Sequence, residues 1–243
     1  MQTKLKITHL YPKHMSLYGD RGNIITLLFR AKQIGVELEL QDCFPNQPID
    51  KNTKLILLGG GQDHDQEKIF KDLLARKDEI KDLISHGTIF LGICGGYQLL
   101  GKSYEAADGQ VLEGLDLLDL TTRKAKAASK RIIGNVRVYS EVFGDLLGFE
   151  NHGGRTYLGE GLKPLGKVLR GGGNNGEDGL EGVFQNYGKG LILGTYFHGF
   201  IPKNIQVADY LIQKITGNSY TQALIQDSVI ENLNTLNGIN LAY

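Results

Sequence analysis

The first half of the chain predicts strands and helices that follow one another in turn. Strands are predicted, by polar–apolar alternation or by short apolar runs, over residues 4–11, 36–43, 55–58 and 88–91. Between them apolar residues recur at helical spacing, over 24–31, 69–74 and 80–84. Asn23 is expected to cap the first of these helices. This order predicts an α/β fold with a doubly wound, mostly parallel sheet flanked by helices.

The second half changes to a strand-rich, glycine-rich pattern. Strands are predicted over 132–139, 146–149, 167–169, 182–187 and 191–196, with a flexible, hairpin-like loop over 171–179. Helical spacing returns over 205–215 and 223–233. Because no Pro/Ser-rich linker divides the 243 residues, we expect residues 1–243 to form a single domain.

Charge and cysteine content exclude several classes of protein. Lysine plus arginine and aspartate plus glutamate number 27 each, so no basic field favours nucleic acid. Cys43 and Cys94 are too few for a disulfide framework, and no metal site is predicted. No apolar window approaches the length of a membrane span, and the N-terminus lacks a signal-peptide pattern, so we expect a cytoplasmic protein.

Cys94 is the strongest candidate for chemistry. It lies between the apolar run 88–91 and a short helical pattern, with Gly92, Gly95 and Gly96 around it. A residue at such a strand-to-helix turn is exposed to substrate, and the N–H groups of the following helix favour a thiolate. The alternative is that Cys94 is a small buried apolar residue.

A second motif overlaps the first. Residues 96–103 match the phosphate-loop pattern G-x-x-x-x-G-K-[ST], in which Lys and Ser open a helix. Here the helix should already begin by Tyr97, so the context disfavours an ATP site at Lys102.

Several polar groups should share the edge of the sheet with Cys94. A glycine loop, 59–61, follows the strand 55–58 and could direct N–H groups at an anion, although a tight turn is the alternative. His198 ends an apolar strand at the same edge and is the predicted base, with His152 as runner-up. His86 precedes a strand and should lie at the opposite edge. The basic run 123–131 is most simply a solvated loop, but Arg131, nearest the following strand, is its best-placed residue to meet a carboxylate.

The segments 92–98 and 194–199 together resemble the class I glutamine amidotransferases, specifically their cobyric acid synthase-like branch, which has a flavodoxin-like fold. Residues 113–115, 148–156 and 173–175 narrow the resemblance to the glutaminase subunits of lipid II isoglutaminyl synthases. The resemblance implies that Cys94 attacks L-glutamine, that His198 moves protons, and that ammonia is released. It further implies an oxyanion hole at Gly60 and Gly95, and substrate binding by Arg131, Gln98 and Asn151.

The resemblance also implies a partner. No cofactor is expected in this chain; a Mur ligase-like subunit would form a heterodimer with it, use ATP and Mg²⁺, and amidate the D-glutamate of lipid II to D-isoglutamine. The alternatives are another acceptor, of the cobyrinic or cobyric acid type, and a non-catalytic binding subunit.

One position departs from the resemblance. Most class I amidotransferases have a glutamate two residues after the catalytic histidine, but Phe200 follows His198 and Gly199 here. We therefore expect the third carboxylate to come from the partner, with Glu150 as the alternative within the chain.

Overall fold

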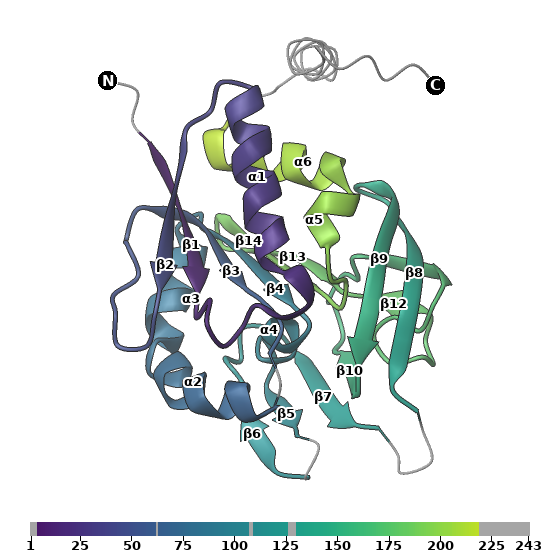
Figure 1. Cartoon of the computed structure of the whole chain (residues 1–243). Coiled ribbons are helices and arrows are strands. Elements are labelled where there is room, and N and C mark those ends of the chain that lie inside the picture. The colour runs from purple at the N-terminus through teal and green to yellow at the C-terminus, as the bar shows by residue number, and fades with distance from the viewer. Residues whose placement is uncertain (1–3, 62, 107–108, 126–129, 219–243) are drawn as a thin grey trace, which may run out of the picture.

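A six-stranded central sheet carries the fold (Figure 1). The computed structural model describes residues 4–61, 63–106, 109–125 and 130–218. The strands follow the order β13-β14-β4-β3-β1-β2, with bounds Val183–Tyr187, Gly190–Thr195, Ile89–Ile93, Thr53–Leu58, Leu5–Leu10 and Leu38–Cys43. All neighbours are parallel except β13, which pairs antiparallel with β14 at one edge. The predicted mostly parallel α/β sheet is confirmed.

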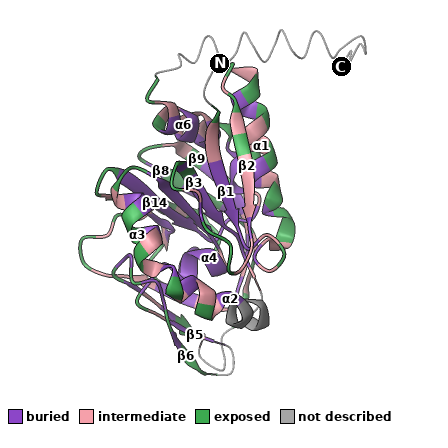
Figure 2. Cartoon of the chain, turned by 90° about the vertical axis from the view of Figure 1, so that its left-hand side faces the viewer, coloured by how far each residue is buried: buried purple, intermediate pink, exposed green. Residues whose placement is uncertain are grey.

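Helices cover both faces of this sheet, because successive apolar side chains of each central strand point to opposite faces and both sets must be buried. Leu55 and Leu57 of β3 pack in the core beneath α1 (Arg21–Gln33) and α6 (Ile205–Thr216). Ile56 and Leu58 face the opposite core, which includes residues of α2 (Asp63–Ala75) and α3 (Lys77–Ser85). The central strands are accordingly buried along most of their length (Figure 2). Short helical segments complete this half: η1 (Leu17–Gly19), α4 (Gly95–Gln98) and α5 (Phe200–Lys203).

The strands between residues 103 and 181 form two further sheets beside the first. One has the order β10-β7-β5-β6, with bounds Gly154–Leu158, Leu120–Lys124, Ser103–Glu105 and Val111–Glu113. The other has the order β12-β11-β8-β9, with bounds Leu180–Glu181, Gly166–Arg170, Ile132–Ser140 and Gly144–His152. The long hairpin of β8 and β9 lies beyond the β13–β14 edge of the central sheet (Figure 1). The predicted helix over 223–233 lies outside the described residues.

Two details differ from the predicted elements. Strands β5, β6, β7, β10 and β12 were not predicted; β5 and β6 are only three residues long, and β12 only two. The prediction that Asn23 caps the first helix is wrong: α1 begins at Arg21, and Asn23 lies inside it. The Oδ1 atom of Asn23 instead accepts the N–H of Ile201 at 2.8 Å. Within the described ranges, no helix is long and apolar enough to cross a membrane.

Candidate active site

Cys94 lies at a sharp turn between β4 and α4. Its backbone has φ 50° and ψ −105°, a conformation that L-residues with a side chain rarely adopt. The N–H of Cys94 donates to Thr195 O at 2.8 Å, and the N–H of Gly96 donates to Gly59 O at 3.1 Å. A Cβ atom at Gly96 would collide with the backbone of Leu58. The turn is therefore held between β14 and the end of β3, and it needs glycine at position 96.

His198 lies three residues after the end of β14, the strand that neighbours β4. Its N–H donates to Phe149 O at 2.9 Å, which joins the end of β14 to β9. The imidazole is buried, with 3% of the residue exposed, and the ring of Tyr18 lies 4.8 Å from it between centroids. The carboxyl ends of β4 and β14 thus bring Cys94 and His198 to one place, as the parallel order predicts.

Gly60 lies against the side chains of His198, Asp20 and Cys94. A Cβ atom built there would lie 2.9 Å from Cε1 of His198, 3.2 Å from Oδ2 of Asp20 and 3.3 Å from Cβ of Cys94. These three side chains therefore surround Gly60 closely enough that any side chain at this position would displace one of them.

Asp20 supplies the carboxylate that the sequence was expected to lack. Its Oδ1 lies 3.1 Å from Nδ1 of His198, and its Oδ2 accepts the N–H of Gly60 at 2.6 Å. The residue is fully buried. Glu150 is occupied elsewhere, because its carboxylate accepts the N–H groups of Gly172 and Gly173. The carboxylate next to His198 was expected from the partner, or from Glu150, but in this structure it comes from Asp20 of this chain.

The surroundings of His198 favour its protonated form. Burial alone would lower the pKa of the imidazole, but the hydrogen bond to Asp20, the charge of Asp20 and the neighbouring Cys94 raise it to about 10. Since Nδ1 faces Asp20, the buried Nε2, which has no hydrogen-bond partner in the described part of the chain, is the nitrogen available to Cys94. A protonated His198 at neutral pH can donate a proton to a leaving group.

The backbone N–H groups of the two predicted oxyanion-hole residues, Gly60 and Gly95, differ in whether they already donate a hydrogen bond. The N–H of Gly60 donates to Asp20 in this structure, and the place of Gly60 in the oxyanion hole stays a prediction. The N–H of Gly95, at the first position of α4, has no acceptor within the described ranges. Gly95 stays a predicted oxyanion donor.

The predicted substrate-binding residues form two groups beside the site. Nε of Arg131 donates to Oδ1 of Asn151 at 2.9 Å, and another guanidinium nitrogen donates to Asn151 O at 3.0 Å. Asn151 is two residues beyond Phe149, which bonds His198, on strand β9. Gln98 is buried at the end of α4, and its Nε2 donates to the Tyr196 hydroxyl at 3.2 Å.

The runner-up base, His152, has the wrong environment for that role. Its ring stacks on Tyr196 with centroids 3.6 Å apart, and Nδ1 bonds Gly154 O at 2.9 Å. Burial lowers the pKa of His152 to about 3, so it is neutral and weakly basic at physiological pH. His152 is therefore a packing residue behind the site.

Comparison with known proteins decides the family. Residues 6–205 match the CobB/CobQ-like glutamine amidotransferase domain. The chain belongs to this family. This amidotransferase chain is 41% identical over 214 residues to the GatD subunit of lipid II isoglutaminyl synthase (glutamine-hydrolyzing) from Staphylococcus aureus, covering 87% of this chain and 84% of that protein. The subunit of the same name from Streptococcus pneumoniae is 38% identical, over 90% of this chain and 83% of its own length.

More distant relatives agree on the fold. A probable cobyric acid synthase from Methanococcus maripaludis is 35% identical over 64% of this chain, but over only 32% of its own length. Among solved structures, the glutaminase domain of Trypanosoma brucei CTPS, with bound acivicin, has a TM-score of 0.57 at 12% identity and covers 90% of this chain and 96% of its own. This structural likeness supports the glutamine amidotransferase fold.

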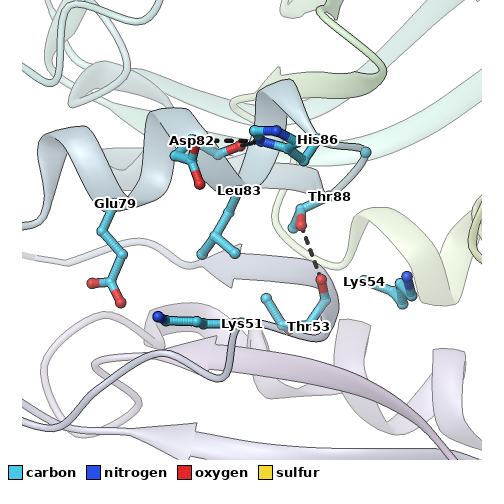
Figure 3. A pocket seen from close by; sticks show the side chains of 9 residues that line it. Lys51, Thr53, Lys54, Glu79, Asp82, Leu83, His86 and Thr88 are labelled. Atoms are coloured by element: carbon cyan, nitrogen blue, oxygen red, sulfur yellow. Dashed lines mark hydrogen bonds and ion pairs between the residues drawn. The ribbon is translucent and has the colours of Figure 1, made fainter.

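Two motifs considered in the sequence, the phosphate-loop pattern at Lys102 and the histidine at position 86, lie away from the active site of the amidotransferase chain. Lys102 and Ser103 lead into β5 instead of opening a helix, and Nζ of Lys102 bonds Asp119 at 2.6 Å, so the phosphate-loop context is absent there. His86 lines a pocket of about 330 Å³ at the opposite, amino-terminal edge of the sheet, with Asp82, Thr53 and Thr88 (Figure 3). That edge is where His86 was predicted to lie.

Proposed function

We propose that this chain is the glutaminase subunit of a lipid II isoglutaminyl synthase and works in the cytoplasm. It hydrolyses L-glutamine to glutamate and ammonia, and a Mur ligase-like partner in a heterodimer uses the ammonia, with ATP and Mg²⁺, to amidate the D-glutamate of lipid II. The family and the names of the two long-matching relatives support this assignment. The observation that carries it is the group of Cys94, His198 and Asp20 around Gly60.

The first half of the reaction forms a thioester. The Cys94 thiolate attacks the side-chain amide carbon of glutamine, a C–S bond forms, and the carbonyl electrons move to the oxygen. In this proposal the N–H of Gly95, the first residue of α4, stabilises the oxyanion. When the intermediate collapses, the C–N bond breaks, protonated His198 gives its proton to the nitrogen, and ammonia leaves.

The second half releases glutamate. His198, now neutral, takes a proton from water, whose oxygen attacks the thioester carbon. The C–S bond then breaks, glutamate leaves, and the thiolate and the imidazolium are restored. No redox step is required, and each proton that His198 gives is regained.

Arg131 is proposed to fix the α-carboxylate of glutamine. Its guanidinium is held in place by Asn151, yet only two of its nitrogens are used in those bonds. The remaining N–H groups can donate to a carboxylate, for which a planar guanidinium is well suited. Gln98 supports the inner wall, because its amide is fixed through the Tyr196 hydroxyl.

The test compares two cysteines of one chain. An electrophilic glutamine analogue should label Cys94, and Cys94→Ser should retain the fold but lose glutamine hydrolysis. Cys43 is the internal control: it is fully buried, and burial raises the pKa of its thiol, so it should stay unlabelled. Labelling confined to Cys43, or full hydrolysis by Cys94→Ser, would contradict the proposed function.

A partner assay tests the second half of the proposal. Adding the Mur ligase-like subunit, ATP and lipid II should yield one amidated lipid II for each glutamine consumed. The same mixture with Cys94→Ser should form product only when free ammonia is supplied. Amidation from glutamine by that variant would show that this chain is not the source of ammonia.

A further inference from the structure

The sheet β12-β11-β8-β9 has one buried face and one outward face. Val136 and Val138 of β8 and Leu146 of β9 pack in the core that also contains residues of α1 and α6. The side chains between them point the other way, and on β8 every second residue from Ile133 to Tyr139 is exposed. In Figure 1 the β8–β9 hairpin forms the right-hand side of the molecule, and every labelled helix lies to its left. The outward face therefore meets solvent in the described part of the chain.

Large apolar side chains are concentrated on this outward face. Of the ten that are exposed in the described chain, five belong to β8, β9, β11 or the turn between β8 and β9, and each is between 49% and 60% exposed: Ile133, Tyr139, Val142, Leu147 and Leu169. The register places Leu147 directly across from Arg137, two residues from Tyr139 along β8. Soluble monomers rarely leave an apolar patch of this kind uncovered, so the face is suited to contact with another chain.

A pocket continues this face at the tip of the hairpin. It has a volume of about 450 Å³, and its walls are Tyr139 and Val142 on one side and the segment 163–167 with Phe184 on the other. Tyr139 belongs both to the pocket and to the outward face. A pocket of this kind can receive an apolar anchor side chain of a partner, which is where the strongest contacts of an interface usually lie.

The charges beside the apolar residues are mainly positive. Arg137 is paired with Asp145, whereas Lys167 and Arg170 of β11 are exposed and have no ion pair within the described ranges. Glu141, in the hairpin turn, is the exposed acid left outside a pair on this part of the described chain. An occupant that fits this face therefore has an apolar centre and carboxylates at its rim. A second copy of the same face offers too few acids for that.

One end of the outward face borders the active site. Ile133 pairs with Asn151, whose side chain holds Arg131. On the same strand as Asn151, the carbonyl of Phe149 accepts the N–H of His198. A chain that covers this face would therefore lie next to the place where ammonia leaves. Keeping ammonia away from bulk water prevents its loss before it reacts.

We propose that the outward face of β8, β9 and β11, together with the pocket at the hairpin tip, is the docking surface for the subunit that accepts the ammonia. The occupant is the Mur ligase-like subunit, and it contributes an apolar anchor surrounded by acidic side chains. This inference rests on the function proposed above and deepens it, because it locates the contact between the two chains.

The first test measures the Kd between the full chain and the Mur ligase-like subunit by calorimetry. Leu147→Glu should raise Kd by about 30-fold or more, because it brings a charge into an apolar contact. The variant should fold, since Asn204 bonds both the N–H and the carbonyl of Leu147 and Arg137 lies directly across from it. Leu169→Ala, which adds no charge, should raise Kd by about 5- to 10-fold. Ile25→Glu is the control: Ile25 is equally exposed, on α1, and Kd should stay unchanged.

A second test concerns the positive charges. Lys167→Glu should slow association with the same subunit by about 3- to 10-fold at low salt, and the effect should shrink as salt is added. Lys54→Glu is the matched control, because Lys54 is also exposed but lies at the amino-terminal edge of the central sheet, where it should not affect association. Equal effects of the two reversals would overturn the proposed charge match.

The outcomes separate this inference from the proposed function. If the wild-type chain binds the Mur ligase-like subunit and both Leu147→Glu and Leu169→Ala bind it equally well, the docking surface is overturned. If Leu147→Glu does not fold, Leu169→Ala decides. A dimer of the chain alone that Leu169→Ala dissociates, while binding of the subunit persists, would show a contact between two copies and overturn the proposal. A wild-type chain that does not bind the subunit, or whose Cys94 resists labelling, would instead contradict the proposed function.

Discussion

Gly60→Ala should damage the site through volume alone. Gly60 has no positive φ, so alanine fits the backbone, and it keeps the N–H that Asp20 accepts. The added Cβ would lie 2.9 Å from Cε1 of His198, whereas ordinary contacts of this kind are 3.4–4 Å. His198 or the glycine loop must therefore move by about 0.5 Å, and Cys94 and Asp20 leave little room for that movement.

The displacement sets the size of the effect. A misplacement of about 1 Å can cost about 100-fold in rate, so we expect kcat/KM for glutamine to fall by about 10- to 100-fold. Overpacking should also lower the free energy of unfolding by about 1–3 kcal/mol. The variant should remain folded and should react more slowly at Cys94.

Glutamine hydrolysis and urea unfolding measure the two effects. Gly22→Ala is the control, because its Cβ would meet only Pro202 Cγ, at 3.6 Å, and alanine within α1 should stabilise the helix by about 0.5–1 kcal/mol. Wild-type kcat/KM in Gly60→Ala would refute the close arrangement of His198, Asp20 and Cys94 around this glycine.

Two further predictions concern basic residues. Arg131→Ala should lower kcat/KM for glutamine by about 10- to 100-fold, mainly by raising KM, and Arg131→Lys should recover part of the loss. Arg137→Ala is the control and should leave kcat/KM unchanged, because Arg137 lies on β8 and is paired with Asp145. Equal effects of the two alanine variants would contradict the role of Arg131. Lys102→Ala should leave ATP consumption by the complex unchanged, because Lys102 bonds Asp119 beside β5; saturable ATP binding by this chain alone, lost in that variant, would restore the phosphate-loop interpretation.

The parts of the site that sequence could predict lie at strand ends. The apolar runs before Cys94 and His198 predict buried parallel strands, and parallel strands place their carboxyl ends at one edge. No structure was needed to bring these two residues together. The edge position of His86 follows from the same argument, since it precedes β4 instead of following it.

Asp20 escaped prediction for a physical reason. An aspartate before an apolar helical pattern is explained locally as a cap, and its contact with His198 spans 178 residues. The hydrogen bond of the Gly60 N–H escaped prediction for a related reason, because a glycine loop indicates available N–H groups but does not reveal which acceptors use them. The short strands β5 and β6 carry too few residues for a period to emerge.

Glu181 leads to a prediction about stability. Its carboxyl group is fully buried; Oε1 accepts from the Thr195 hydroxyl and the Tyr196 N–H, while Oε2 has no hydrogen-bond partner among the described residues. Burial raises the pKa of Glu181 from 4.5 to about 7. The native state therefore binds this proton more tightly than the unfolded state does, so stability is lost as pH rises from about 4.5 to about 7.

The loss amounts to about 3 kcal/mol if Glu181 alone is considered. Glu181→Gln should remove this contribution, because an amide carries no charge and retains an oxygen for Thr195 and Tyr196. Urea unfolding between pH 5 and 7 should then show a flatter dependence of stability on pH than in the wild type. The exposed Glu160→Gln is the control and should preserve the wild-type slope. The same slope in Glu181→Gln as in the wild type would mean that Glu181 is already ionised in the folded protein at pH 5. In that case Glu181 of β12 would carry a buried negative charge beside Thr195 and Tyr196, close to the site.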